Sequence, residues 1–213
     1  MKGAFITFEG SEGTGKSTQI SLLALRLRTV GRTVLTLREP GGTPIGEEIR
    51  HTLKHSAANH AMTPEAELLL MNASRAQLVR EVIRPALAAG EIVVCDRFYD
   101  STTAYQGYGR QLDLDTVQTM IDFAVGETRP DLTLLLRVPL EMSAQRLLAR
   151  QSTMPFLRDR IEEADRDFFA RVAQGYQAIA AAEWERVRTI DATATVDELA
   201  AVIWDFVQPL VKR

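Results

Sequence analysis

The stretch FEGSEGTGKSTQI, residues 8–20, brings three glycines and a lysine into one short segment. Its residues 10–17 match the pattern G-x-x-x-x-G-K-[ST] at every position. Glycines let successive backbone N–H groups converge on phosphate oxygens, and a helix that begins near Lys16 would add the positive end of its dipole. Lys16 can reach the β- and γ-phosphates, and the Ser17 hydroxyl can ligate Mg²⁺. The segment therefore predicts a loop that binds the phosphates of a nucleoside triphosphate.

Short apolar runs recur on both sides of this loop and alternate with longer stretches of helical spacing. The runs occupy residues 4–8, 33–37, 92–95, 132–136 and 187–190. Near-continuous apolar runs, rather than alternating ones, are typical of strands that are covered on both faces. Repeated strand–helix units indicate an α/β fold, with a five-stranded parallel sheet and helices on both faces. We expect a single domain over residues 1–213.

Composition excludes several classes of function. A net charge of −3 argues against a nucleic acid polymer as the main ligand, because proteins that bind a phosphate backbone usually carry a basic excess. Cys95 is the only cysteine, so an internal disulfide is excluded. No apolar run reaches ~18 residues, so we expect no membrane span. The first residues lead into a strand without a signal-peptide pattern, and we expect the chain in the cytoplasm.

Polar segments follow the predicted strands at the edge where open α/β sheets bind ligands. REPGGTPIG (38–46) follows the second strand and DRFYDSTTAYQGYGR (96–110) follows the third. Asp96 is placed to hold the hydration shell of Mg²⁺, and Arg97 would set a bidentate cation beside the transferred phosphoryl group. RQSTMPFLRDR (150–160) is polar and rich in arginine, which predicts a mobile lid over this edge.

Several motifs together resemble those of bacterial thymidylate kinases, which phosphorylate dTMP to dTDP with ATP. In chain order they are FEGSEGTGKST, REPGGT, DRF…DSTTAYQGYGR, RPDLTLLL, DRIE and FF…V…Y. The resemblance covers nearly the whole chain, from about residue 4 to the C-terminal helix. It implies the three-layer P-loop kinase fold with a short lid at about 150–160, MgATP as donor, a place in dTTP synthesis and a homodimer.

The resemblance also implies an acceptor site. Glu12 matches the acid that accepts a hydrogen bond from the deoxyribose 3′-hydroxyl. Arg97 matches the arginine that clamps the 5′-phosphate, and Arg75 matches the arginine that donates to a thymine carbonyl. Further residues are expected around the thymine and sugar: Arg38, Pro40, Leu53, Met71, Thr102, Tyr105 and Gln106. Among them Tyr105 would exclude a ribose 2′-hydroxyl, and Met71 stands where the family usually has an aromatic residue that stacks on thymine.

On the donor side we expect contacts from the phosphate loop, from a helix arginine and from the turn after the last strand. These residues are Gly10, Ser11, Glu12, Gly13, Thr14, Gly15, Lys16, Ser17, Thr18, Arg146, Ala192 and Thr193, with Ser17 and Asp96 at the metal. Gly13 occupies a position where some family members carry a basic residue, so the resemblance places the catalytic arginine on the lid. Besides Lys16 and Arg97, the catalytic candidates are Arg150, Arg158 and Arg160, of which we favour Arg160.

Two other functions remain open. The chain could be a kinase for another nucleotide, such as dUMP, which its acceptor preference would reveal. It could also be a P-loop switch that binds nucleotide and signals through shape. Such switches usually position a hydrolytic water with a dedicated Gln, and they lack a second pocket lined by Arg and Tyr.

Overall fold

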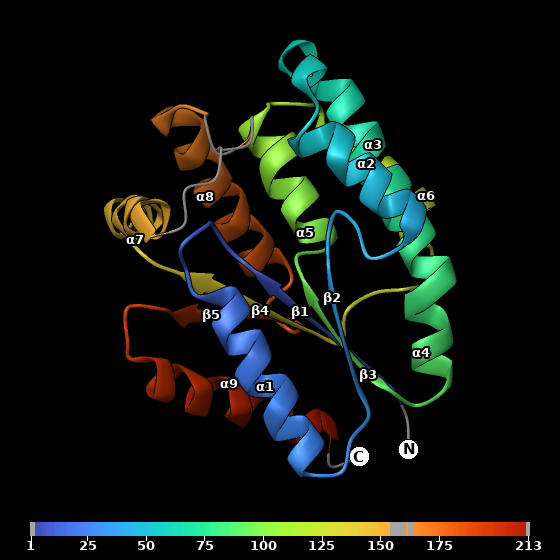
Figure 1. The fold of residues 1–213 in the computed structure, drawn as a ribbon, viewed down its shortest axis with the longest axis vertical. Coiled ribbons are helices and arrows are strands. Elements are labelled where there is room, and N and C mark those ends of the chain that lie inside the picture. Colours follow the sequence, from blue (N-terminus) through green and yellow to red (C-terminus); the bar gives the residue numbers. More distant parts are fainter. Residues whose placement is uncertain (1–2, 154–160, 162–163, 212–213) are drawn as a thin grey trace.

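The computed structural model describes residues 3–153, 161 and 164–211; the side chains of residues 150–153 lie outside that description. Five strands form one fully parallel sheet in the order β2-β3-β1-β4-β5 (Figure 1). The strands are β1 (Ala4–Glu9), β2 (Val34–Arg38), β3 (Ile92–Asp96), β4 (Leu132–Arg137) and β5 (Val187–Asp191). The predicted α/β class and the five strands are confirmed.

Each strand runs one residue further at its carboxyl end than the apolar run that predicted it, and that extra residue is charged. The added residues are Glu9, Arg38, Asp96, Arg137 and Asp191. The strand register aligns two of these ends directly, because Asp96 lies opposite Arg38 of β2; on its other side Asp96 lies opposite Phe8, one residue before Glu9. Charged side chains therefore gather at this edge of the sheet; Glu9 among them is buried, whereas Arg137 and Asp191 are exposed.

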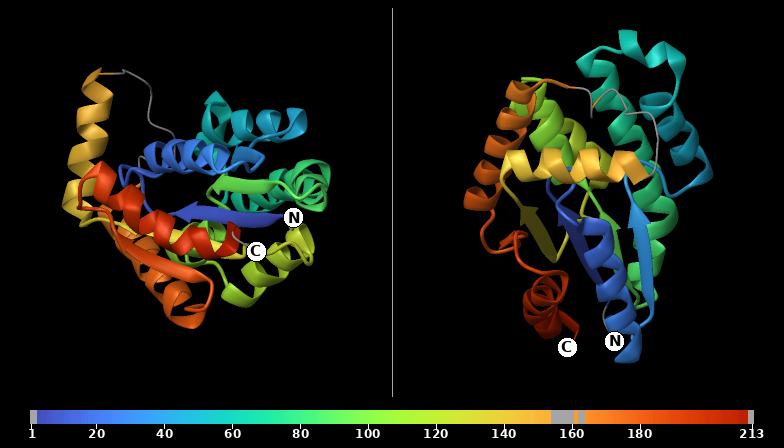
Figure 2. Two further views of the ribbon diagram at one scale, coloured as in Figure 1. Left: turned by 90° about the horizontal axis from the view of Figure 1, so that it is seen from below. Right: turned by 60° about the vertical axis from the view of Figure 1, so that its left-hand side comes forward.

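Helices cover both faces of the sheet. They are α1 (Lys16–Thr29), α2 (Pro44–Lys54), α3 (Pro64–Leu78), α4 (Arg84–Ala88), α5 (Tyr99–Thr102), α6 (Leu114–Val125), α7 (Leu140–Thr153), α8 (Arg166–Ala182) and α9 (Val196–Val211). A 3₁₀ segment, η1 (Ala57–Ala61), and two π-helical segments, η2 (Val79–Ile83) and η3 (Thr103–Gly109), join them. Figure 2 shows α7 standing out at one side of the molecule.

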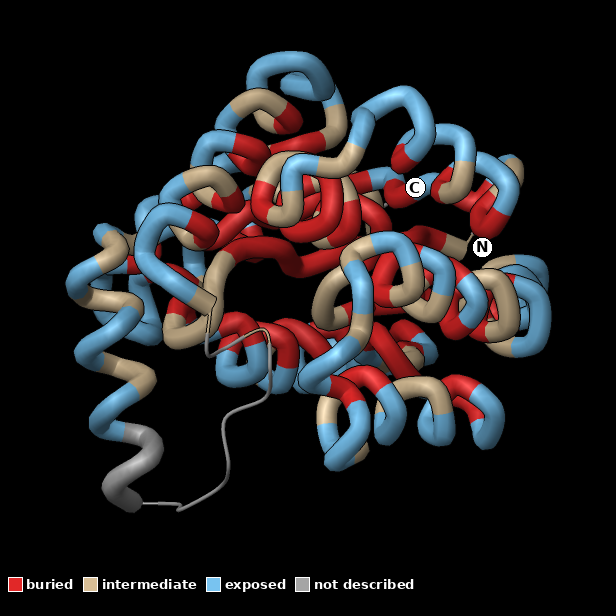
Figure 3. Tube along the Cα trace, turned by 90° about the horizontal axis from the view of Figure 1, so that it is seen from above, coloured by how far each residue is buried: buried red, intermediate tan, exposed pale blue. Residues whose placement is uncertain are grey.

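The core has a part on each side of the sheet. On one side α1 and α9 pack together against Ile6 and Phe8 of β1 (Figure 1). On the other side Phe5 and Val93 point toward α3, η2 and α6, while α8 covers β4 and β5. This alternation follows from the two-residue period of a strand. The buried strands lie between exposed outer helix surfaces (Figure 3).

Local capping signals explain where several helices begin. The side chains of Thr43 and Thr63 accept hydrogen bonds from the backbone N–H groups of Gly46 and Ala66, and a proline follows each threonine. Such a cap satisfies one of the free N–H groups of the first turn, and proline is well suited to the position after it. Within the described part of the chain, no helix is both long and apolar enough to cross a membrane.

Candidate active site

A cavity of about 590 Å³ opens at the carboxyl ends of β1, β2 and β3. Its walls come from the phosphate loop, from the segments after β2 and β3, and from α2, α3, η3 and α7. Sixteen of the residues predicted from the sequence line it: Glu12, Gly13, Gly15, Lys16, Ser17, Thr18, Arg38, Pro40, Met71, Arg75, Asp96, Arg97, Thr102, Tyr105, Gln106 and Arg146. The cavity therefore joins the predicted donor and acceptor residues in one space.

The phosphate loop has the predicted form. Gly15, with φ of 92°, precedes α1, which begins at Lys16 and lines the cavity with its first turn. The Lys16 ammonium donates to the carbonyl oxygens of Gly10 at 3.0 Å and Ser11 at 2.9 Å. Burial, followed by repulsion from Arg97, lowers the pKa of Lys16. A buried cation beside free helical N–H groups suits a polyanionic ligand.

Helix α7 is tied directly to this loop. The Ser143 hydroxyl donates to the Glu12 carbonyl at 2.6 Å, and the Arg146 guanidinium donates to the carbonyls of Gly13 at 3.3 Å and Ala192 at 3.2 Å. A Cβ atom on Gly13 would lie 2.9 Å from the Ser143 carbonyl oxygen. The packing of α7 thus leaves no room for a side chain at Gly13.

Ser17 and Asp96 form the candidate metal site. The Ser17 hydroxyl donates to Asp96 Oδ2 at 3.4 Å, and Asp96 Oδ1 is buried without a hydrogen-bond partner among the described residues. A buried carboxylate oxygen without a partner is costly unless another group satisfies it. The described residues contain no cluster of three or more His, Cys, Asp or Glu side chains. The Ser17 hydroxyl and the Asp96 carboxylate suit Mg²⁺, which keeps several waters and takes phosphate oxygens as its other ligands.

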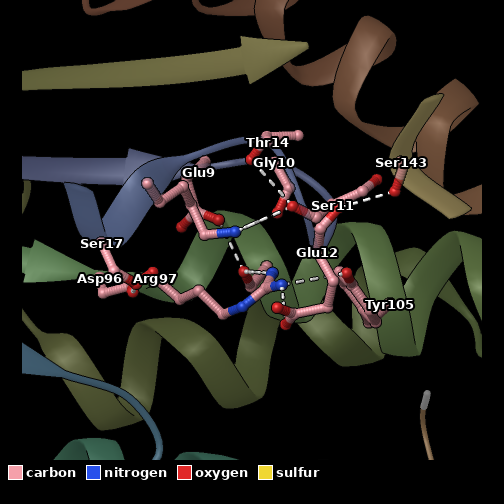
Figure 4. A network of polar contacts seen from close by, with 12 residues as sticks. Glu9, Gly10, Ser11, Glu12, Thr14, Ser17, Asp96, Arg97, Tyr105 and Ser143 are labelled. Atoms are coloured by element: carbon pink, nitrogen blue, oxygen red, sulfur yellow. Dashed lines mark hydrogen bonds and ion pairs between the residues drawn. The ribbon is translucent and has the colours of Figure 1, made fainter. Parts of the chain in front are cut away.

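Arg97 stands at the centre of a dense polar network (Figure 4). Its backbone has a φ of 69°, in the left-handed region that non-glycine residues rarely adopt. The Nη2 group donates to Glu12 Oε1 at 2.8 Å and to the Tyr105 hydroxyl at 3.2 Å. The Nη1 group donates to the hydroxyls of Ser101 at 3.1 Å and Tyr176 at 3.3 Å. The guanidinium is thus held at four points beside the phosphate loop.

The acids around Arg97 have opposite electrostatic environments. Burial alone would raise the pKa of Glu12, but Arg97 and Lys16 hold it well below its usual range. Glu9 is fully buried, and burial together with the charge of Asp100 raises its pKa to about 7, although Arg97 opposes the shift. Glu12 is therefore a firmly ionised group at the cavity wall, whereas Glu9 titrates near neutral pH beneath it.

A second buried arginine forms the far wall. The Arg75 side chain is 2% exposed and its Nε group donates to Glu39 Oε2 at 2.9 Å. Two further donations, to Asn72 Oδ1 at 3.0 Å and to the Phe98 carbonyl at 3.3 Å, hold its guanidinium in place. Burial raises the pKa of Glu39 in spite of Arg75. Met71 lies one helical turn before Arg75 on α3 and lines the same cavity.

Some predicted residues do not line the cavity. Leu53 is 1% exposed and packs in the interior, and Ala192 and Thr193 lie in the turn after β5 rather than in the cavity wall. Ala192 is nevertheless linked to Gly13 through Arg146. Gly10, Ser11 and Thr14 belong to the phosphate loop without being wall residues. The Arg150 side chain, Arg158 and Arg160 lie outside the described residues.

Sequence reasoning missed several residues of this site, among them Phe98, Ile161 and Phe169 of the cavity wall. Arg50 and Lys54 line the cavity from α2, and their spacing of four residues places them on one helical face. Glu9 and Ser101 lie inside motifs that were quoted for other residues, and Tyr176 ends the FF…V…Y motif. No signal in the sequence joins these last three, because they meet through the packing of α5 and α8 beside the end of β1.

Comparison with known proteins agrees with this architecture. A family model described as "Thymidylate kinase" matches residues 8–203. The thymidylate kinase of Chlorobium luteolum is 50% identical over 202 residues, which cover 93% of this chain and 94% of that protein. One from Synechococcus sp. (strain JA-2-3B'a(2-13)) is 49% identical and covers 96% of this chain and 94% of its own. The crystal structure of thymidylate kinase from Ehrlichia chaffeensis superposes with a TM-score of 0.78 at 31% identity, covering 98% of this chain and 99% of that one.

Proposed function

Since the chain belongs to the thymidylate kinase family, we propose that it transfers the γ-phosphoryl group of MgATP to dTMP, forming ADP and dTDP for dTTP synthesis. The observation that carries the proposal is that one cavity has the phosphate loop on one side and a wall lined by Arg75 and Arg97 on the other. A kinase that joins two nucleotides needs both anion-binding surfaces in one space, with the reacting oxygens in line.

On the donor side, the loop of residues 10–17 binds the phosphates and Lys16 leaves its loop carbonyls to contact them. Ser17 and Asp96 would hold Mg²⁺, which would neutralise charge on the β- and γ-phosphates. Asp96 Oδ1 supports this role because it is buried without a partner in the described structure. Thr18, Arg146 and the turn at Ala192 and Thr193 complete the donor site.

On the acceptor side, Arg97 binds the dTMP phosphate and Glu12 accepts the 3′-hydroxyl. The base lies against Met71, Arg75 and Tyr105, and Arg38, Pro40, Thr102 and Gln106 shape the surrounding pocket. Leu53 is buried and does not line this pocket. The acceptor phosphate is already an anion, so the transfer needs no strong general base. Closure of the lid excludes water, which would otherwise hydrolyse ATP, and brings Arg150, Arg158 or Arg160 to the γ-phosphoryl group. Among these we favour Arg160.

We further propose that the chain is a single domain over residues 1–213 and acts in the cytoplasm as a homodimer. The resemblance to bacterial thymidylate kinases supports the dimer. Light scattering during gel filtration tests it, since a monomer would elute with the 23.7 kDa mass of one chain.

A kinase for another nucleotide is the second candidate; Met71 raises it, but the thymidylate kinase relatives do not favour it. A thioether packs against a ring face but constrains its orientation less than an aromatic residue does. dUMP, which lacks the thymine methyl group, would be the most similar alternative acceptor.

The test is ADP formation from MgATP with dTMP, dUMP, thymidine ribonucleotide and dGMP as separate acceptors. We expect strong preference for dTMP in the wild type, and a further gain in preference in Met71→Phe. A preference for dUMP would support the second candidate. Slow ATP turnover that does not depend on any acceptor would contradict both and support a nucleotide-binding switch.

A further inference from the structure

We propose that Glu9 is a positioning residue for Arg97, and that it acts through the hydroxyl groups of Ser101 and Tyr176. The inference rests on the proposed function, because it assumes that Arg97 binds the acceptor phosphate. Glu9 is not a wall residue of the cavity; it lies beneath Arg97 in the protein interior, 0% exposed.

Glu9 gathers three donors from two other elements. Its Oε1 accepts from the backbone N–H of Phe98 at 2.7 Å. Its Oε2 accepts from the Ser101 hydroxyl at 2.6 Å and from the Tyr176 hydroxyl at 2.9 Å. One carboxylate at the end of β1 therefore holds the backbone just after Arg97, the third residue of α5 and the middle of α8.

The direction of these bonds orients Arg97. A hydroxyl group has one proton, and a carboxylate can only accept. When Glu9 is ionised, both hydroxyls can donate to it, and their oxygens, which lie 3.0 Å apart, are left to accept from Arg97 Nη1. Arg97 Nη1 donates to Ser101 at 3.1 Å and to Tyr176 at 3.3 Å. Glu9 thus turns two neutral hydroxyls into fixed acceptors on one side of the guanidinium.

The other side of the guanidinium has a different partner. Nη2 donates to Glu12 and Tyr105, which line the cavity. Of the residues on the Nη1 side, Ser101 also lines the cavity, whereas Glu9 and Tyr176 are buried in the interior. Glu12 is partly exposed and can exchange Arg97 for a ligand, but the interior bonds can persist while the ligand is bound. The interior bonds therefore hold the Arg97 head group in place during turnover.

A glutamine at position 9 keeps the shape but cannot keep this pattern. If its NH₂ group took the place of Oε2, it would donate to the two hydroxyls and turn their protons toward Arg97. If the NH₂ group took the place of Oε1, it would face the Phe98 N–H, and two donors would meet. Either orientation disturbs Arg97 or its backbone.

The experiment measures kcat and the KM values for dTMP and ATP in wild type, Glu9→Gln, Tyr176→Phe and the double variant. Tyr99→Phe is the matched control, because it removes one hydroxyl from a buried tyrosine whose ring contacts Arg186 instead of Arg97. We expect Glu9→Gln and Tyr176→Phe to lower kcat/KM for dTMP by about 10- to 100-fold, with the KM for ATP changed less than about 2-fold. The double variant should lower kcat/KM for dTMP no further than Glu9→Gln does, since both changes break the same hydrogen-bond network around Arg97.

Three results would overturn the inference: unchanged kcat/KM for dTMP in both single variants, equal effects on both substrates, or fully multiplicative effects in the double variant. If Glu9→Gln does not fold, Tyr176→Phe and Ser101→Ala against Tyr99→Phe test the same bonds. Wild-type protein without dTMP-dependent turnover would instead contradict the proposed function, so the two failures are distinguishable.

Discussion

Arg97 shows how much of this site depends on one residue with an unfavourable backbone conformation. Its positive φ costs on the order of 1–3 kcal/mol, which the surrounding structure must offset. The backbone N–H donates to the Phe8 carbonyl at 2.9 Å and the guanidinium makes four hydrogen bonds. This backbone conformation lets the chain turn away from the end of β3 while the Arg97 side chain points back over the phosphate loop.

Arg97→Lys should keep the charge but lose the planar fork that binds a phosphate through two donors. We expect the KM for dTMP to rise about 10- to 100-fold while the KM for ATP stays nearly constant. Initial rates at varied dTMP and saturating ATP measure this. Arg129→Lys is the control, because its ion pair with Asp122 is largely exposed, with side chains 38% and 52% exposed. Equal effects of the two variants would show that Arg97 has no special role.

Asp96→Asn removes one carboxylate oxygen from the candidate metal site and leaves its size unchanged. We expect the Mg²⁺ concentration for half-maximal activity to rise about 10-fold or more, and EDTA to abolish activity of the wild type. Titration of the rate with Mg²⁺ at fixed ATP is the measurement, and Asp115→Asn, on the exposed face of α6, is the control. An unchanged Mg²⁺ dependence would place the metal elsewhere.

At the scale of elements, short capped helices present the cavity residues. Helix α2 carries Arg50 and Lys54 on one face, and it begins at the Thr43 cap. Thr43→Ala should lower the free energy of unfolding by about 1 kcal/mol, because one N–H group of the first turn loses its acceptor. Urea denaturation measures this value. Thr52→Ala on the same helix should change it little, since Thr52 is exposed and bonds only to the Glu48 carbonyl; equal losses in both variants would contradict the cap.

Helix α7 connects the donor side of the site through Arg146, which bridges the Gly13 and Ala192 carbonyls. Arg146→Ala should raise the KM for ATP several-fold and leave the KM for dTMP nearly constant, because the phosphate loop loses its tie to the turn after β5. Steady-state kinetics with each substrate varied separates the two values. Arg166→Ala, which breaks an ion pair with side chains 81% and 67% exposed, is the control and should change neither.

At the scale of the whole molecule, a buried polar network runs under the site across several elements. The Arg186 guanidinium donates to both carboxylate oxygens of Asp100 at 2.7 and 2.8 Å, and Thr133 donates to Asp100 at 3.2 Å. The charge of Asp100 in turn acts on Glu9. Because such charges are buried, the stability of the fold depends on pH.

Glu9 should make stability depend on pH in a defined window. Burial and Asp100 raise its pKa to about 7 in the folded protein, against 4.5 for the ordinary group. Between these values the folded state binds the proton more tightly, so the stability that Glu9 contributes falls as pH rises from about 4.5 to about 7. The free energy of unfolding of wild type relative to Glu9→Gln should therefore fall by roughly 2–4 kcal/mol over this window. Denaturation of both proteins at pH 5 and pH 8 measures it, and a constant difference would contradict the raised pKa.

Local patterns were sufficient to predict the strands, the class of fold and the phosphate loop. Apolar runs report burial on both faces of a strand, and the loop depends on glycine conformations and one helix start within eight consecutive residues. These features act over short distances along the chain, so composition and spacing reveal them. Arg97 lies in a motif quoted for the resemblance, and the resemblance also implied a role for Arg75; both line the cavity.

Packing between distant segments decided the rest. On α2, the rotation of the helix against α3 buried Leu53 and turned its neighbour Lys54 to the cavity. Glu9 and Tyr176 are separated by 167 positions and meet only because α8 packs over β4 and η3. A single sequence contains no local signal for such a meeting, since the hydrogen bond depends on the relative placement of a strand end and a helix face.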